Sequence, residues 1–202
     1  MKLNVIKTVI FIFCSVFGLA SAAEQDAPKK LDSATFAGGC FWCMQHDFDD
    51  VEGVVSTTAG YTGGVKADPT YEEVSKGGTG HVESVRVEYD PKKISYEQLL
   101  DVYWHNIDPT RDDGQFCDSG SQYRPVIFYH NKEQKRLADQ YKEALIRSKK
   151  IEPILVEILP AKTFYPAEEY HQEYYKKNPG RYKFYRYNCG RDQRLKEVWG
   201  KK

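Results

Sequence analysis

Hydrophobic and polar positions alternate along this chain in short blocks that predict strands and helices in turn. In the clearest block, residues 81–89, one strand face carries His81, Glu83, Val85, Val87 and Tyr89, whereas the other is mostly polar. Further strands are predicted at residues 33–37, 54–59, 126–129 and 154–158. Helices are predicted at residues 41–50, 95–106, 131–148 and 167–175.

The order of these elements predicts the fold class. Ser95 with Gln98, and Asn131 with Gln134, have the spacing of capping boxes, which open helices. The chain then runs strand, helix, strand, strand, helix, strand, followed by a further helix and strand. This order is typical of an α/β (α+β) two-layer sandwich around a split β-α-β, ferredoxin-like core. We expect an irregular C-terminal tail to follow it.

Length and charge favour one globular domain that does not bind nucleic acid. The chain has 202 residues, of which 41% are hydrophobic, so it is long enough to bury a core. Its 29 basic residues balance 29 acidic ones, whereas proteins that coat nucleic acid are usually basic. A run of arginines and tyrosines near the C-terminus is interpreted as a solvated tail whose tyrosines pack on the domain.

The N-terminus has the pattern of a signal peptide. Lys2 and Lys7 precede an apolar run at residues 9–19, and Ala20-Ser21-Ala22 supplies small residues for cleavage after Ala22. The apolar run is short for a membrane span, although an uncleaved anchor is the alternative. We therefore predict a signal peptide at 1–22, a linker at 23–31 and a catalytic domain at 32–202. The mature protein is expected to be exported, periplasmic or secreted, without stable membrane association.

The segment Gly38-Gly39-Cys40-Phe41-Trp42-Cys43 carries the candidate chemistry. A cysteine at a helix N-terminus feels the positive end of the backbone dipole, which stabilises its thiolate. A second thiol three residues on can trap whatever the first becomes. The same spacing also occurs in zinc sites, but these need four ligands and the segment supplies two. A purely structural disulfide is the other alternative.

Glu83 is a polar residue on the apolar face of its predicted strand. We expect it to be buried, and burial favours the protonated acid, which can donate a proton. Alternatively, it lies at an edge or pairs with Arg86 or His81. His81 and Glu83 could also form half of a metal site.

Two glycine-rich stretches, 60–64 and 76–80, flank this strand and allow close backbone approach to a ligand. Tyr71 lies between them. The connection 107–124, which has no obvious element, carries Asp118 and Tyr123, and long loops in compact domains are often functional. Taken singly, each tyrosine is interpretable as an ordinary core or surface aromatic.

Six sequence blocks occur in the order Gly39-Cys40-Phe41-Trp42, Gly60-Tyr61-Thr62-Gly63-Gly64, Pro69-Thr70-Tyr71, Gly80-His81-Val82-Glu83, Gly120-Ser121-Gln122-Tyr123-Arg124 and Ala167-Glu168-Glu169-Tyr170-His171-Gln172. Together they resemble the A-type peptide methionine sulfoxide reductases. The resemblance implies that family's α/β sandwich and reduction of the S-epimer of methionine sulfoxide, free or in proteins. It implies no metal and no bound organic cofactor, but an external dithiol, a thioredoxin-like protein, as reductant. A monomer that repairs oxidised exported proteins is expected.

The resemblance also implies roles for individual residues. Cys40 is the expected nucleophile, protonated Glu83 the expected proton donor, and Asp118 orients the polar side of the site. Tyr71 and Tyr123 are expected to donate hydrogen bonds to the sulfoxide oxygen. Phe41 and Trp42 are expected to form the apolar pocket for the substrate S-methyl group. Product methionine leaves Cys40 as a sulfenic acid, which a second thiol converts to a disulfide.

The cysteine that resolves the sulfenic acid is not fixed by the resemblance. Many family members carry it soon after an Asn-Pro-x-Gly turn, but here the next cysteine after residues 178–182 is Cys189. Cys43 and Cys117 are further candidates. We predict that Cys189 and Cys43 act jointly by relay. The rival functions are a thioredoxin-like disulfide oxidoreductase using Cys40 and Cys43, and a zinc-binding module.

Overall fold

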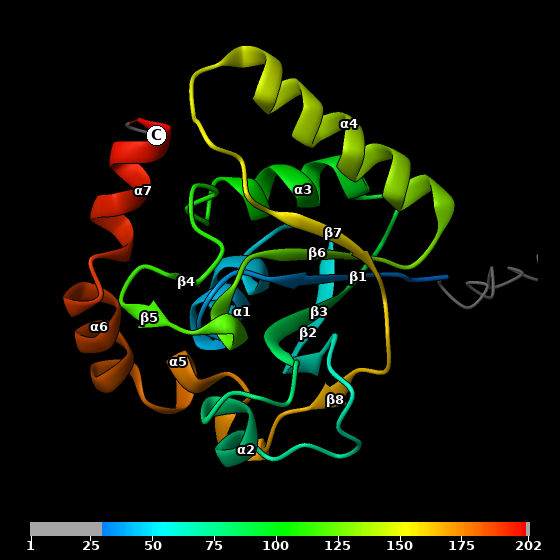
Figure 1. The fold of residues 1–202 in the computed structure, drawn as a ribbon. Coiled ribbons are helices and arrows are strands. Elements are labelled where there is room, and N and C mark those ends of the chain that lie inside the picture. The colour runs from blue at the N-terminus through cyan, green and yellow to red at the C-terminus, as the bar shows by residue number, and fades with distance from the viewer. Residues whose placement is uncertain (1–29, 201–202) are drawn as a thin grey trace, which may run out of the picture.

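A computed structural model of the protein describes residues 30–200, so the expected signal peptide and most of the expected linker lie outside the described residues. Its centre is a six-stranded sheet in the order β7-β6-β1-β3-β2-β8 (Figure 1). The strands are β1 (Asp32–Ala37), β2 (Val54–Thr62), β3 (Val82–Tyr89), β6 (Val126–Tyr129), β7 (Glu157–Pro160) and β8 (Tyr165–Pro166). The main helices are α1 (Phe41–Asp49), α2 (Tyr71–Ser75), α3 (Tyr96–Trp104), α4 (Lys132–Ser148), α5 (Tyr174–Lys177), α6 (Pro179–Asn188) and α7 (Arg191–Trp199).

The ferredoxin-like core is confirmed. Strands β6, β1, β3 and β2 are neighbours in that order and pair antiparallel throughout. The crossover through α4 adds β7 parallel to β6 at one edge, and β8 pairs with β2 at the other. The predicted two-layer α/β sandwich is thus correct, and the sheet is mixed rather than purely antiparallel.

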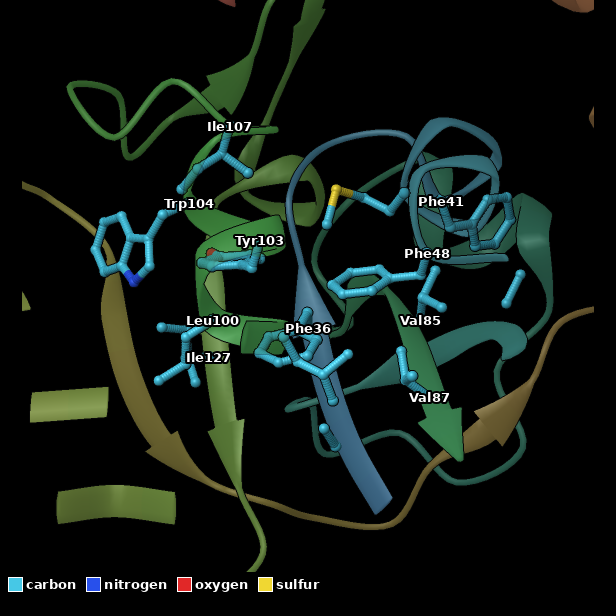
Figure 2. Packing of buried hydrophobic residues seen from close by; sticks show 14 of the residues in the cluster. Phe36, Phe41, Phe48, Val85, Val87, Leu100, Tyr103, Trp104, Ile107 and Ile127 are labelled. Carbon is cyan, nitrogen blue, oxygen red and sulfur yellow. The ribbon is translucent and has the colours of Figure 1, made fainter. Parts of the chain in front are cut away.

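The main hydrophobic core lies between one face of this sheet and the helices packed on it. Figure 2 shows Val85 and Val87 of β3 facing Phe48 of α1, with Phe36 of β1 between them and Tyr103 of α3. The Phe36 ring stacks on Phe48 and on Tyr103, with ring centroids 5.1 Å apart in each pair. The face of β3 predicted to be apolar is therefore the core face.

Both predicted helix starts are confirmed by their caps. Ser95 accepts a hydrogen bond from the Gln98 backbone N–H at 3.2 Å, and the Gln98 side chain accepts one from the Ser95 N–H at 2.9 Å. Asn131 likewise caps α4 by accepting from the Gln134 N–H at 2.9 Å. Each cap satisfies backbone donors that the first helical turn leaves without partners.

The C-terminal region differs from the prediction. A helix at 167–175 is wrong, because the chain there forms a short 3₁₀ turn at Glu169–His171 and reaches α5 only after Glu173, whose φ is +48°. The expected irregular tail is also wrong. It forms α6, opened by Pro179 at its first turn, and α7, separated from α6 by Gly190 at φ +67°.

Two smaller differences concern connections. The last predicted strand lies slightly later in the sequence, as β7, because residues 154–156 only lead into it. The connection 107–124 contains a small two-stranded ribbon, β4 (Gly114–Gln115) with β5 (Asp118–Ser119), and a 3₁₀ turn at Ser121–Tyr123. Among the described residues, the helices are all too short or too polar to cross a membrane.

Candidate active site

Cys40 lies where the central strand β1 turns into α1. Gly39 has φ +84°, and a Cβ there would lie 2.7 Å from Cβ of Gln115, so both the turn and the approach of the 107–124 loop require glycine. Cys40 is the N-cap of α1, and its carbonyl accepts the first helical hydrogen bonds from Cys43 and Met44. The predicted position at a helix N-terminus is therefore confirmed.

Cys40 and Cys43 are both free thiols, and both are buried, at 7% and 2% exposed. Their side chains share a hydrogen bond across the first turn of α1. That hydrogen bond and the charges of Arg191 and Arg186 lower the pKa of Cys43 to about 7, against the burial that raises it. The Cys40 pKa is raised well above its usual value, first by burial and then by Cys43, Glu83 and Asp118.

These shifts correct one sequence-based interpretation. The helix dipole alone predicts Cys40 as the thiolate of the pair. In the folded protein, burial beside two carboxyl groups raises the Cys40 pKa, whereas the charges of Arg191 and Arg186 lower the Cys43 pKa. These directions favour a thiolate at Cys43 over one at Cys40.

Glu83 is buried, as predicted, with 3% of its surface exposed. Burial raises its pKa to about 8, although its carboxylate accepts a hydrogen bond from the Phe41 N–H at 3.0 Å, which acts in the opposite direction. The alternative partners are engaged elsewhere, because Arg86 pairs with Glu88 and both ring nitrogens of His81 bond to backbone groups. Glu83 is thus a largely neutral acid near pH 7. It bonds to the backbone N–H of Phe41, the residue that follows Cys40.

Tyr71 and Tyr123 come together at the site from two separate loops. Both are half-buried, and burial raises the pKa of each hydroxyl, to about 12 for Tyr71. Glu83 is the next cause of each shift, and Cys40 and Asp118 add to it, so both rings face the same group of acids and thiols. Both hydroxyls stay protonated at neutral pH and can donate hydrogen bonds.

The backbone of Tyr71 is fixed at the start of α2. Its N–H donates to Glu168 Oε1 at 2.8 Å, and Glu168 also accepts from the Tyr61 hydroxyl at 2.9 Å. Sequence reasoning assigned no role to Glu168. Only its position in block 167–172, one of the six blocks that carry the family resemblance, could have indicated a role for it.

Asp118 of β5 also reaches the site. Its carboxylate accepts the Cys40 N–H and, at 2.5 Å, the hydroxyl of Tyr185 on α6. Burial raises its pKa in spite of these hydrogen bonds. Asp118 therefore links the turn that carries Cys40 to the C-terminal helices.

Phe41 and Trp42 differ in their surroundings. Phe41 is 1% exposed and belongs to the main core, with its ring centroid 5.1 Å from that of His171. Trp42 is half-buried, stacks on Tyr174 with ring centroids 3.7 Å apart, and donates from Nε1 to His171 Nδ1 at 3.0 Å. Trp42 with Tyr174 is thus the more accessible aromatic surface beside Cys40.

Cys117 and Cys189, far apart in sequence, form a disulfide. Cys117 is exposed and precedes Asp118, whereas Cys189 is half-buried at the end of α6. The donor atoms of Cys117, Asp118 and Cys189 lie within 4.8 Å of one another, but both sulfurs are joined in the disulfide. Metal-binding thiolates need free cysteines, so this group does not fit a zinc site in its present state.

The sequence analysis did not identify a group of charged residues that packs against α1 near Cys43. Arg191, at the start of α7, is 1% exposed and lies 3.6 Å from Asp47 of α1. Arg186 of α6 pairs with the same carboxylate at 2.9 Å. The basic tail interpreted as solvated therefore places Arg191 inside the protein and leaves Arg186 partly buried, while its Tyr182 packs on the domain as expected.

Comparisons with known proteins agree with this arrangement. Residues 32–202 match the family model described as peptide methionine sulfoxide reductase. The peptide methionine sulfoxide reductase MsrA of Halalkalibacterium halodurans is 53% identical over 174 residues, covering 86% of this chain and 99% of that protein.

Solved structures agree as well. Methionine sulfoxide reductase A of Corynebacterium diphtheriae is 32% identical with a TM-score of 0.66, covering 76% of this chain and 77% of that one. Mxr1 from Saccharomyces cerevisiae in reduced form is 33% identical with a TM-score of 0.71, covering 76% of this chain and 89% of that one. Mxr1 in complex with Trx2 matches less closely, at 26% identity and a TM-score of 0.52, covering 73% of this chain and 87% of that one. This chain therefore belongs to the peptide methionine sulfoxide reductase family and is an oxidoreductase that reduces methionine sulfoxide.

Proposed function

We propose that the chain reduces the S-epimer of methionine sulfoxide, free or in proteins, with Cys40 as nucleophile and Glu83 as proton donor. The sulfur of Cys40 attacks the sulfoxide sulfur while the sulfoxide oxygen takes the Glu83 proton, and the Glu83 carboxylate takes up the proton that Cys40 loses. Tyr71 and Tyr123 donate hydrogen bonds to that oxygen, and Asp118 holds the Cys40 turn. The oxygen then passes to Cys40, which becomes a sulfenic acid, and methionine leaves.

One observation carries this proposal. A neutral buried carboxyl group, Glu83, hydrogen-bonds to the Phe41 N–H, the backbone group next to Cys40. A sulfoxide sulfur is a poor electrophile until its oxygen is protonated or strongly hydrogen-bonded, so a thiol needs an acid in this place. A disulfide oxidoreductase would not need that acid, and it is the reason to prefer sulfoxide chemistry at Cys40. Trp42 is the proposed apolar wall for the S-methyl group, with Phe41 behind it.

The test is incubation of the protein with each separate methionine sulfoxide epimer and dithiothreitol, following the loss of each epimer. We expect loss of the S-epimer alone. Exchange of dithiols and disulfides without loss of either epimer would favour the thioredoxin-like alternative instead. Tightly bound zinc after purification would favour the metal-binding alternative.

We infer that Cys43 and Cys189 act jointly to regenerate Cys40. Cys43 is one helical turn away and already hydrogen-bonded to Cys40, which favours it as the first thiol to attack the sulfenic acid. Cys189 is bonded to Cys117, and Tyr185, one turn earlier in α6, reaches Asp118 beside Cys40. This favours the Cys117/Cys189 pair as the route by which reducing equivalents arrive from outside.

We expect normal first-turnover methionine from Cys43→Ser and Cys189→Ser, because resolution follows the chemical step. Steady turnover with a thioredoxin-like reductant should fall for either variant. The measurement is a reaction with one equivalent of sulfoxide, then peptide mapping of disulfides, with Cys117→Ser alongside. If only Cys117→Ser loses turnover, and the mapped disulfide joins Cys40 to Cys117, the relay is wrong.

A thioredoxin-like protein is the proposed reductant. The exposed position of Cys117 gives an external thiolate access to the disulfide, and Mxr1 has been solved in complex with Trx2. We further propose that the enzyme binds no metal and no organic cofactor, because two thiols, an acid and hydrogen-bond donors suffice for each step. Loss of the S-epimer by chelator-treated protein would support this.

Export is proposed from the N-terminal sequence, with the mature chain a periplasmic or secreted monomer that repairs oxidised exported proteins. The basic residues, the apolar run and Ala20-Ser21-Ala22 support it. Mass spectrometry of protein from its native host should find a chain that begins near Ala23. An intact N-terminus on a cytosolic protein would refute export.

A further inference from the structure

Cys43 shares one face of α1 with Asp47, because residues four apart lie above one another on a helix. The guanidinium of Arg191 lies against this face. Its Nη2 atom is 3.2 Å from Met44 Sδ and 3.6 Å from Asp47 Oδ2. Arg191 thus contacts the residue that follows Cys43 and the residue one turn after it, and its charge acts on the Cys43 thiol.

Arg191 is held there by contacts that fix its side chain. Nη2 donates to the Asn106 carbonyl at 2.7 Å and Nη1 to the Gly38 carbonyl at 3.4 Å. The guanidinium carbon also lies 4.5 Å from the centre of the Phe116 ring. Burying a charged group this deeply is unfavourable unless other groups compensate its charge. Asp47 compensates part of this charge, and it is shared with Arg186, which also pairs with Asp192.

We propose that Arg191, with Arg186 beside it, is a positioning residue of the reaction: it holds the negative charge of the Cys40/Cys43 pair on Cys43. This rests on the proposed function, in which Cys43 attacks the Cys40 sulfenic acid. In that step the Cys43 thiolate forms the sulfur–sulfur bond, the sulfur–oxygen bond of Cys40 breaks, and the departing hydroxide takes the proton of Glu83 and leaves as water. No external oxidant or reductant is needed.

Other titratable groups also face Cys43, and they determine what a pH titration reports. They are Cys40 and Asp47 on α1, Glu83 on β3, Tyr182, Tyr185 and Arg186 on α6, and Arg191 on α7. Asp47 raises the Cys43 pKa, whereas the two arginines lower it. Removing one arginine must therefore raise the pH at which Cys43 ionises.

The experiment follows the alkylation rate of Cys43 by iodoacetamide against pH, read by mass spectrometry of the peptide that contains it. The full chain carries Cys40→Ser, which keeps a hydroxyl donor toward Cys43 and leaves no competing thiol in the pair. With both arginines present, the midpoint is expected to lie below that of an ordinary cysteine, because their charges lower the pKa of Cys43. We expect Arg191→Gln, which keeps donors for the two carbonyls, to raise it by about one pH unit or more, as loss of a neighbouring opposite charge does.

Two further variants show that charge is responsible. Arg191→Lys keeps the cation and should keep the midpoint. Arg194→Gln is the matched control on the same helix, because Arg194 pairs with Asp108 rather than with the α1 face, and it should not move the midpoint. A merely structural role for Arg191 would not distinguish Lys from Gln in this way.

The proposal is overturned if Arg191→Gln folds, by circular dichroism, with an unshifted Cys43 midpoint. If Arg191→Gln does not fold, Arg186→Gln decides, and an unshifted midpoint there overturns the proposal. Because the titration uses no sulfoxide, failure of the proposed reductase reaction would leave its outcome unchanged. The two proposals can therefore fail separately.

Discussion

Cys40→Ser is expected to abolish methionine formation even in a single turnover with protein in excess over sulfoxide. Cys40 is the N-cap of α1, beside the backbone group that bonds to Glu83, and no other thiol shares that position. A serine hydroxyl has a much higher pKa than a thiol and does not become a sulfenic acid, so the first chemical step has no substitute nucleophile. The measurement is quantification of methionine after rapid quenching.

Cys43→Ser is the matched control for this experiment, because it removes a buried thiol from the same helical turn. It should still convert the limiting sulfoxide to methionine, at about one equivalent of methionine per sulfoxide. The assignment of Cys40 as the nucleophile is wrong if Cys40→Ser forms measurable methionine in the first turnover while the control behaves as expected.

Glu83→Gln is expected to slow methionine formation by roughly 10²- to 10⁴-fold, the usual contribution of general acid catalysis. The amide side chain keeps the shape of the acid but has no proton to release to the sulfoxide oxygen. The fold should persist, because the amide oxygen introduced by this substitution can still accept the hydrogen bond from the Phe41 N–H. An unchanged rate with unchanged circular dichroism would count against Glu83 as the acid.

The pH dependence provides a second check on Glu83. Its pKa is raised to about 8, so the carboxyl is protonated below that pH and loses its proton as the pH rises through it. Methionine formation should therefore fall above about pH 8 in the wild type. The alkaline fall should be missing in Glu83→Gln.

The sequence predicted the fold well where the signal is local. Alternation along residues 81–89 identified the core face of β3, and the caps at Ser95 and Asn131 are set by residues three apart. The C-terminal helices were missed for the opposite reason. They are rich in charged residues and lack a strong apolar stripe, and they are held by contacts with residues more than a hundred positions earlier, such as Arg191 with Asp47.

The same distinction separates the correct and incorrect parts of the site. Burial of Glu83 was predictable from its neighbours on one strand, and so was the position of Cys40 before a helix. Which thiol of the pair carries the charge was not, because it depends on Asp118 and Arg191, which reach α1 from distant segments. The disulfide between Cys117 and Cys189 was one of six possible pairs among the four cysteines of the described residues.

The mounting of the two reacting groups on adjacent central strands has a mechanical consequence. Cys40 follows the end of β1, and Glu83 lies on β3, which pairs with β1 along five registered positions. Hydrogen bonds of the sheet therefore set the spacing between nucleophile and acid. The disulfide, the aromatic surface at Trp42 and the helices that carry Arg191 all belong to the periphery. Rearrangement of these peripheral elements would leave the distance between the proposed nucleophile Cys40 and the proposed acid Glu83 unchanged, because the sheet sets that distance.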